Sequence, residues 1–160
     1  MIDLEKIKLE MLKNKPIEEI LRNFNWREFE EIVAEIFRRN EFKVKQNFKF
    51  KIKKKHEIDL LAVKQNLIFC VDCKKWSSGR YKKSGIKIAA TKQEKRTRMV
   101  RNFLKKNPIA MRMLKIGQTP KFYSLIVTLM EEDIIQEKKT FIVPIFKLNS
   151  FLLESERHLY

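Results

Sequence analysis

Two aspartates and a lysine stand near a point where two apolar segments meet. Residues 56–63 and 67–74 are both of strand length, and a short polar turn separates them. If two residues form that turn, the segments pair as a hairpin and Asp59 lies directly opposite Asp72. Their Cβ atoms would then be roughly 5 Å apart on one face of a sheet. Lys74 follows Asp72 by two positions and projects from the same face.

This arrangement favours a metal site. Opposed carboxylates repel and destabilise a bare hairpin, whereas a divalent cation between them turns the repulsion into ligation. Mg²⁺ prefers such oxygen ligands, and Mn²⁺ is an alternative. In the same register Glu57 would face Lys74. The simpler interpretation is an ordinary ion pair between Asp72 and Lys74 at a strand end.

The charge balance points to a polyanionic partner. The chain has 160 residues with 36 Lys+Arg and 20 Asp+Glu, a net charge of +16, and a pI near 9.9. Such a charge favours nucleic acid, although a generally lysine-rich proteome would also produce many lysines. The hydrophobic fraction of 44% fits a globular fold. We expect a single domain over 1–160, with a helical extension at 1–24 and a core at 25–156.

Other functional classes have less support. No apolar leader or membrane-length segment is visible, so we expect a cytoplasmic protein without a membrane partner. Cys70 and Cys73 form a C-x-x-C pattern, but in a strand they point to opposite faces and no second Cys/His pair exists. They are interpreted as buried thiols.

The hydrophobic patterns predict an α/β fold. Asn25 with Glu28 forms a capping box for a helix to about Arg39, with an apolar stripe that includes Trp26. Other expected helices cover 3–13, 16–23, 86–106 and 148–155, and expected strands cover 42–52, 56–63, 67–74, 122–129 and 141–145. A loop is expected at 77–85. This order gives a mixed central sheet flanked by helices on both faces.

Asp59, followed 13 positions later by Asp72-x-Lys74, resembles the motif of the PD-(D/E)xK nucleases. The preceding helix, with Phe29-Glu30 and later Phe37, is similar to the Mrr-type restriction endonucleases and the archaeal Holliday junction resolvases. The resemblance covers about 25–150 and implies a restriction-endonuclease-like core. Two positions depart from the family: Ile58 replaces Gly or Pro, and Asn40 or Glu41 replaces a glycine after the first helix, with Asn40 the workable substitute.

The resemblance implies a Mg²⁺-dependent DNA endonuclease. Asp59, Asp72 and the backbone carbonyl of Cys73 would hold the metal, and Lys74 would orient the attacking water or stabilise the phosphate. Glu30 would be an auxiliary carboxylate, since it lies at the edge of the apolar stripe whereas Glu31 and Glu35 face solvent. The alternative is that Glu30 is a solvated helix residue with no role in the site.

Basic and aromatic residues follow the lysine. We expect phosphate contacts from Lys75, Arg80, Lys82, Lys83, Lys92 and Arg96. Trp76 and Tyr81 either pack into the core or stack on an unpaired base. Two alternatives to an Mrr-like nuclease remain: a Holliday junction resolvase, which acts as a homodimer, and a nucleic-acid-binding protein of the same fold that does not cut.

Overall fold

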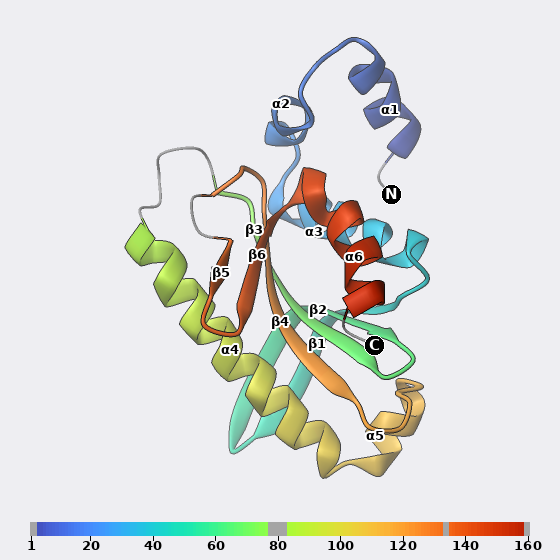
Figure 1. Ribbon diagram of the computed structural model, residues 1–160, viewed down its shortest axis with the longest axis vertical. Coiled ribbons are helices and arrows are strands. Elements are labelled where there is room, and N and C mark those ends of the chain that lie inside the picture. The colour runs from blue at the N-terminus through green and yellow to red at the C-terminus, as the bar shows by residue number, and fades with distance from the viewer. Residues whose placement is uncertain (1–2, 77–82, 133–134, 159–160) are drawn as a thin grey trace.

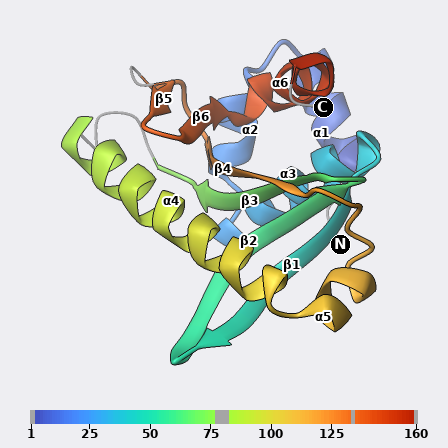
Figure 2. The ribbon, with the colours of Figure 1, turned by 60° about the horizontal axis from the view of Figure 1, so that its bottom comes forward.

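The computed structural model describes residues 3–76, 83–132 and 135–158, and it has the α/β architecture that the sequence predicts. A six-stranded mixed sheet lies between two layers of helices (Figures 1 and 2). Its strand order is β1-β2-β3-β4-β6-β5, in which the β3–β4 and β4–β6 pairs are parallel and the other pairs are antiparallel. The strands are β1 (Lys43–Ile52), β2 (Lys54–Lys64), β3 (Leu67–Lys74), β4 (Lys121–Thr128), β5 (Gln136–Glu137) and β6 (Thr140–Pro144).

The helices divide between the two faces of the sheet. Residues of α3 and α6 join one core cluster, together with residues from the N-terminal helices, and α4 and α5 pack on the other face. Neither α5 nor the two-residue β5 was expected from the hydrophobic patterns. The helices are α1 (Leu4–Leu12), α2 (Ile17–Arg22), α3 (Trp26–Arg39), α4 (Lys83–Lys105), α5 (Pro108–Met113) and α6 (Ile145–His158).

Helix α3 begins and ends for local reasons. The Asn25 side chain accepts from the Glu28 N–H, and the Glu28 carboxylate accepts from the Asn25 N–H, so the predicted capping box is present. At the other end the left-handed residue is Glu41, with φ of 66°, and not Asn40 as expected. Asn40 is buried and donates to the Ile36 carbonyl and the Asn149 side chain. Trp26, placed in the apolar stripe, is 56% exposed.

The β2–β3 hairpin has the predicted register, but it is shorter than predicted. Lys64 pairs with Leu67, and the pairing continues to Leu60 opposite Val71, where it stops. Asp59 and Asp72 therefore lie just beyond the last pair, and the strands separate there (Figure 1). We call this gap, bounded by Asp59 on β2 and 72–74 on β3, the fork.

The cause of the fork is a change of face in both strands of the β1–β2 hairpin. Asn47 has φ of 50°, and it and Asp59 are the positions that the β1–β2 ladder skips. On one side of this step Val44 and Leu60 pack on the α3 face. On the other side Phe48 and Ile58 pack on the α4 face, although strict alternation would keep all four on one face. The distal hairpin consequently bends away from β3.

Asn47 tests this explanation, because a left-handed backbone is costly for a β-branched residue. We expect Asn47→Val to lower the free energy of unfolding by about 1–2 kcal/mol relative to Asn47→Gly, which accepts positive φ without strain. Urea unfolding of the two variants measures the difference. Equal stabilities would show that the step in β1 does not depend on the conformation of residue 47.

Candidate active site

The fork brings together the residues that the motif predicted. Asp72 and Lys74 come from β3, and the Lys74 Nζ lies 3.0 Å from an Asp72 carboxylate oxygen. The other Asp72 oxygen lies 3.3 Å from the Arg96 guanidinium of α4. Asp72 itself is 4% exposed. This buried carboxylate thus has a cation on each of its oxygens, and both cations lie toward the α4 face.

Asp59 is held by the backbone of β3. Its Oδ2 accepts a hydrogen bond of 2.9 Å from the Cys73 N–H, which takes the place of the strand pairing that ends at Leu60. The prediction that Asp59 and Asp72 form a directly opposed pair is wrong, because the step at Asn47 and Asp59 has already turned β2 away. Glu57 likewise pairs with Lys49 of β1, and not with Lys74.

The Cys73 carbonyl faces the same gap. The N–H and C=O groups of one strand residue point to the same side, and those of the next residue point to the other. The Lys74 carbonyl accepts from Leu129, just beyond β4, and the Cys73 N–H points to Asp59. The Cys73 carbonyl oxygen therefore points into the fork, where the resemblance places a metal ligand.

Glu30 reaches the site from α3. It is 8% exposed, as its position at the edge of the apolar stripe predicted. Glu31, by contrast, is bound by Arg38 and Gln46. Burial raises the pKa of Glu30 to about 7, with a further increase from the carboxylates of Asp59, Glu57 and Asp72. This repulsion shows that Glu30 shares its surroundings with the fork.

The same crowding acts on the two groups beside Glu30. Burial, followed by the Asp72 charge, raises the pKa of Asp59 against the hydrogen bond from Cys73. Burial and the surrounding carboxylates raise the pKa of the Cys73 thiol well above its usual range. Cys73 is consequently a neutral thiol, so its contribution to a metal would be the carbonyl oxygen and not a thiolate.

The donors of the fork fit a hard cation. Within the described residues no three His, Cys, Asp or Glu side chains form a ready-made metal cage. Mg²⁺ does not need one, because it is commonly held by one or two carboxylates and several waters. Asp59, Asp72 and the Cys73 carbonyl would supply such a set to a bound ion, and Glu30 would act on it through water.

The expected phosphate-binding residues have different positions. Lys92 and Arg96 line a cavity of about 310 Å³ beside Asp72 and Lys74, and half-buried Trp76 lines it too. Lys83 is exposed at the start of α4. The Lys75 ammonium instead donates to the Arg22 carbonyl at the end of α2. Arg80, Tyr81 and Lys82 lie outside the described residues.

Gln93 is a site residue that sequence reasoning missed. It is 1% exposed, its amide nitrogen donates to the Cys70 carbonyl, and its amide oxygen accepts from Arg96 at 3.4 Å. One side chain thus connects β3 with the guanidinium that contacts Asp72. The available signal was a long amide at a position of α4 where helical spacing from Ile86 and Ala90 predicts a buried residue.

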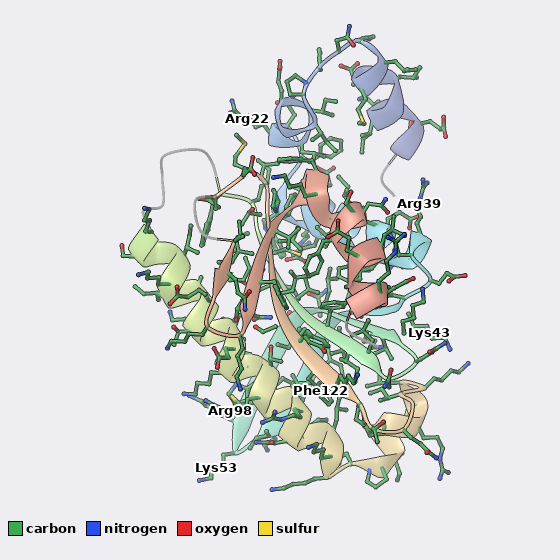
Figure 3. The ribbon with its side chains drawn as sticks, viewed as in Figure 1. Arg22, Arg39, Lys43, Lys53, Arg98 and Phe122 are labelled. Atoms are coloured by element: carbon green, nitrogen blue, oxygen red, sulfur yellow. The ribbon has the colours of Figure 1, made fainter. Side chains whose placement is uncertain are left out.

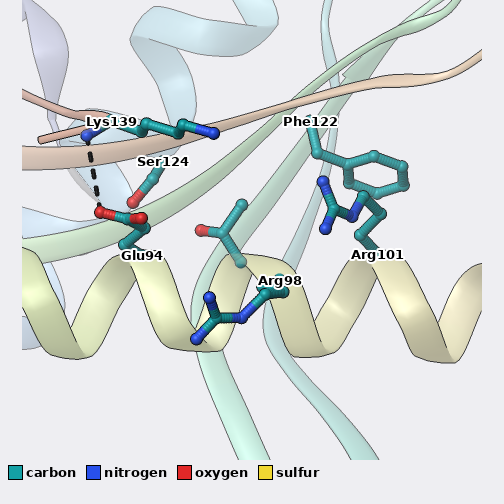
Figure 4. Close-up of a pocket in the computed structure, with 7 residues that line it drawn as sticks. Glu94, Arg98, Arg101, Phe122, Ser124 and Lys139 are labelled. Carbon is teal, nitrogen blue, oxygen red and sulfur yellow. Dashed lines mark hydrogen bonds between the residues drawn. The ribbon is translucent and has the colours of Figure 1, made fainter.

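A separate pocket lies on the other flank of α4. Its volume is about 170 Å³, and its lining residues are Glu94, Thr97, Arg98, Arg101, Phe122, Ser124 and Lys139 (Figure 4). The Glu94 carboxylate accepts from the Lys139 N–H at 3.5 Å. Glu94 is the single carboxylate among these described lining residues, so the pocket lacks the paired carboxylates that metal-assisted hydrolysis requires.

Comparisons with known proteins identify the family. The profile of the nuclease-related domain, NERD, matches residues 25–129, which include α3, the fork, α4 and β4. The chain belongs to the nuclease-related domain family. This NERD protein is also 28% identical over 136 residues to an uncharacterized protein of Archaeoglobus fulgidus, across 84% of this chain and 93% of that one.

A solved structure gives a more distant likeness. The crystal structure of AF1548, a protein of unknown function, aligns with a TM-score of 0.41 and 15% identity. The alignment covers 80% of the NERD protein but 55% of the length of AF1548. Within the described part of the NERD protein, no helix is long and apolar enough to cross a membrane.

The pKa of Glu30 predicts an unusual dependence of stability on pH. Between pH 4.5 and about 7 the folded state keeps a proton on Glu30 that the unfolded state releases, so Glu30 lowers stability as the pH rises through this window. With metal removed by EDTA, the change in the free energy of unfolding caused by Glu30→Gln should therefore be more favourable at pH 8 than at pH 4.5. The two changes should differ by roughly 1–2 kcal/mol after allowance for solvent screening.

Denaturant unfolding at the two pH values measures this effect. Glu31→Gln is the matched control, because Arg38 and Gln46 lower the pKa of Glu31. That control should lose stability at pH 8 relative to pH 4.5, the opposite sign. A Glu30→Gln effect that does not change with pH would contradict the placement of Glu30 among the carboxylates of the fork.

Proposed function

We propose that this NERD protein is a Mg²⁺-dependent endonuclease that hydrolyses phosphodiester bonds of DNA, similar to the Mrr-type enzymes. The observation that carries the proposal is the meeting of Asp59, Asp72 and Lys74 at the fork in a chain of net charge +16. Membership of the nuclease-related family supports the same reaction. Paired carboxylates in so basic a protein would oppose phosphate binding unless a metal neutralised them.

Each residue of the fork has a defined task in this proposal. Asp59, Asp72 and the Cys73 carbonyl would hold the metal. When bound, the ion lowers the pKa of a water and polarises a phosphate oxygen. Cys73 fixes the orientation of the Asp59 carboxylate through its N–H, so little reorganisation is needed when substrate arrives.

The cationic groups complete the arrangement. The Lys74 ammonium, which forms an ion pair with Asp72, would orient the attacking water or stabilise the charge that develops on the phosphate. Arg96, which contacts Gln93, and the exposed Lys92 border the adjacent cavity, and in this proposal they would contact the phosphates next to the cleaved bond. Mn²⁺ would satisfy the same oxygen donors.

Cleavage of labelled DNA tests the proposal. Linear duplex, single-stranded and four-way-junction DNA are incubated with the protein in Mg²⁺, Mn²⁺ or EDTA. We expect metal-dependent cutting that Asp72→Asn reduces at least ~100-fold, because the variant loses a charged metal ligand. Glu94→Gln is the matched control, since Glu94 lies on the other flank of α4, and it should retain cleavage.

The outcomes distinguish the alternative functions. Preference for linear duplex supports the Mrr-like activity, whereas preference for the junction supports a resolvase, which requires two-fold association. Circular dichroism verifies that Asp72→Asn remains folded. Tight, salt-sensitive binding without cutting in Mg²⁺ or Mn²⁺ would replace the enzyme with a nucleic-acid-binding protein of the same fold.

A further inference from the structure

The β1–β2 hairpin beyond the fork has two unlike faces. Between Phe48 and Ile58 it carries five lysines and a single acidic residue, Glu57. Its apolar face, with Phe48 and Phe50, packs against α4 and α5. Figures 1 and 2 show this hairpin extending away from the rest of the sheet, and Figure 3 shows Lys53 near its end. The opposite face, which we call the open face, carries Lys49, Lys51, Lys55 and Glu57, all of them exposed.

Two lysines of the open face are cross-strand neighbours. Lys51 and Lys55 are directly opposed in the β1–β2 ladder, an arrangement that destabilises a strand pair. Lys49, one step nearer the fork, faces Glu57. Among the described residues, neither Lys51 nor Lys55 has an ion-pair partner. The hairpin thus retains a local repulsion that an external anion would relieve.

Protection of a sheet edge does not account for this pattern. β1 is an edge strand, and lysines on an edge hinder association with other strands. Lys51 on β1 alone would serve that purpose. Lys55 lies on β2 beyond the end of its pairing with β3 and borders a second unpaired edge. Edge protection does not require the two lysines to be directly opposed, and their opposition adds repulsion within the hairpin.

The open face is continuous with the fork. Glu57 lies close enough to Glu30 for its charge to act on that carboxyl group, and Asp59 is two residues further along β2. Lys55 is four residues from Asp59, which corresponds to about 13 Å along a strand. At 3.4 Å per base pair, this is about four base pairs of duplex DNA.

We propose that the open face of the β1–β2 hairpin binds the phosphate backbone of duplex DNA, about four base pairs from the cleaved bond. The assignment extends the proposed endonuclease function and rests on it for the position of cleavage. Lys51 and Lys55 supply the principal contacts, because their charges are uncompensated within the hairpin. Their contacts are to phosphates and not to bases, so they add affinity without sequence preference.

The salt dependence of binding tests the proposal. The affinity of a fluorescent 30-base-pair duplex is measured between 50 and 200 mM salt, in EDTA so that no cutting occurs. Each phosphate contact contributes about 0.9 to the slope of log affinity against log salt. We expect the double variant Lys51→Gln/Lys55→Gln to reduce the magnitude of that slope by about 1.8. Between 50 and 200 mM salt, the factor by which its affinity falls should therefore be about tenfold smaller than for the unsubstituted protein.

The control has the same change of net charge at the far edge of the sheet. Lys138→Gln/Lys139→Gln alters the β5–β6 turn, at the end of the strand order opposite to β1. We expect this control to leave the slope unchanged. Equal slopes in all three proteins, or the same decrease in both variants, would overturn the proposal, because the hairpin would then make no specific contribution.

Stability separates a binding role from a structural one. Removal of the opposed pair should leave the unfolding midpoint of Lys51→Gln/Lys55→Gln equal to or above that of the unsubstituted protein, while DNA binding weakens. A lower midpoint with an unchanged slope would overturn the assignment in favour of a structural role. Cleavage in Mg²⁺, measured in parallel, keeps the two proposals distinct: a slope change without cutting supports the hairpin contact and contradicts the endonuclease.

Discussion

The hydrogen bond from the Cys73 N–H to the Asp59 carboxylate is the contact on which the site depends. In an uninterrupted hairpin, a backbone carbonyl of β2 would accept that N–H, and the sheet would continue past the two aspartates. The left-handed Asn47 and the change of face at Asp59 end the ladder after Leu60. The Asp59 carboxylate then accepts from the Cys73 N–H, which has no backbone partner on β2. This hydrogen bond thereby holds a carboxylate within the sheet, where an unpaired charge would be unfavourable.

Burial of these carboxylates has an energetic cost that the surrounding structure offsets unequally. Asp72 has Lys74 and Arg96 on its two oxygens, and Asp59 has one backbone donor. Among the described residues, Glu30 has only the charge of Arg27 to offset its burial and the neighbouring carboxylates, and its pKa is raised. Local destabilisation of this kind is typical of functional sites, where charges are arranged for a ligand and not for the free protein. Gln93 of α4 connects the helix to β3 through a buried hydrogen bond to the Cys70 carbonyl, and it also contacts Arg96 of this cluster.

Sequence patterns predicted most of the elements, and the reasons for the exceptions are specific. The capping box of α3, the turn register at Lys64 and Leu67, and the inward position of Glu30 all follow from local periodicity or from short-range pairing. The separation of Asp59 from Asp72 depends on Asn47, a residue of another strand, and alternation rules assume that no such interruption occurs. Trp26 satisfies the helical period but lies at the first turn, beyond the layer that covers the rest of the stripe. Gln93 was missed because its hydrogen bond to the Cys70 carbonyl joins residues 23 positions apart, which no local pattern encodes.

The two edges of the sheet have a consequence for self-association. One edge, β1, alternates lysines along its length and is interrupted at Asn47, and the other, β5, has two residues and is followed by Lys138 and Lys139. Neither edge offers a long, flat and uncharged row of backbone donors and acceptors to a neighbouring chain. Two copies would therefore meet through helices or loops, and not by extending one continuous sheet. In a dimer each copy would then keep its own six-stranded sheet.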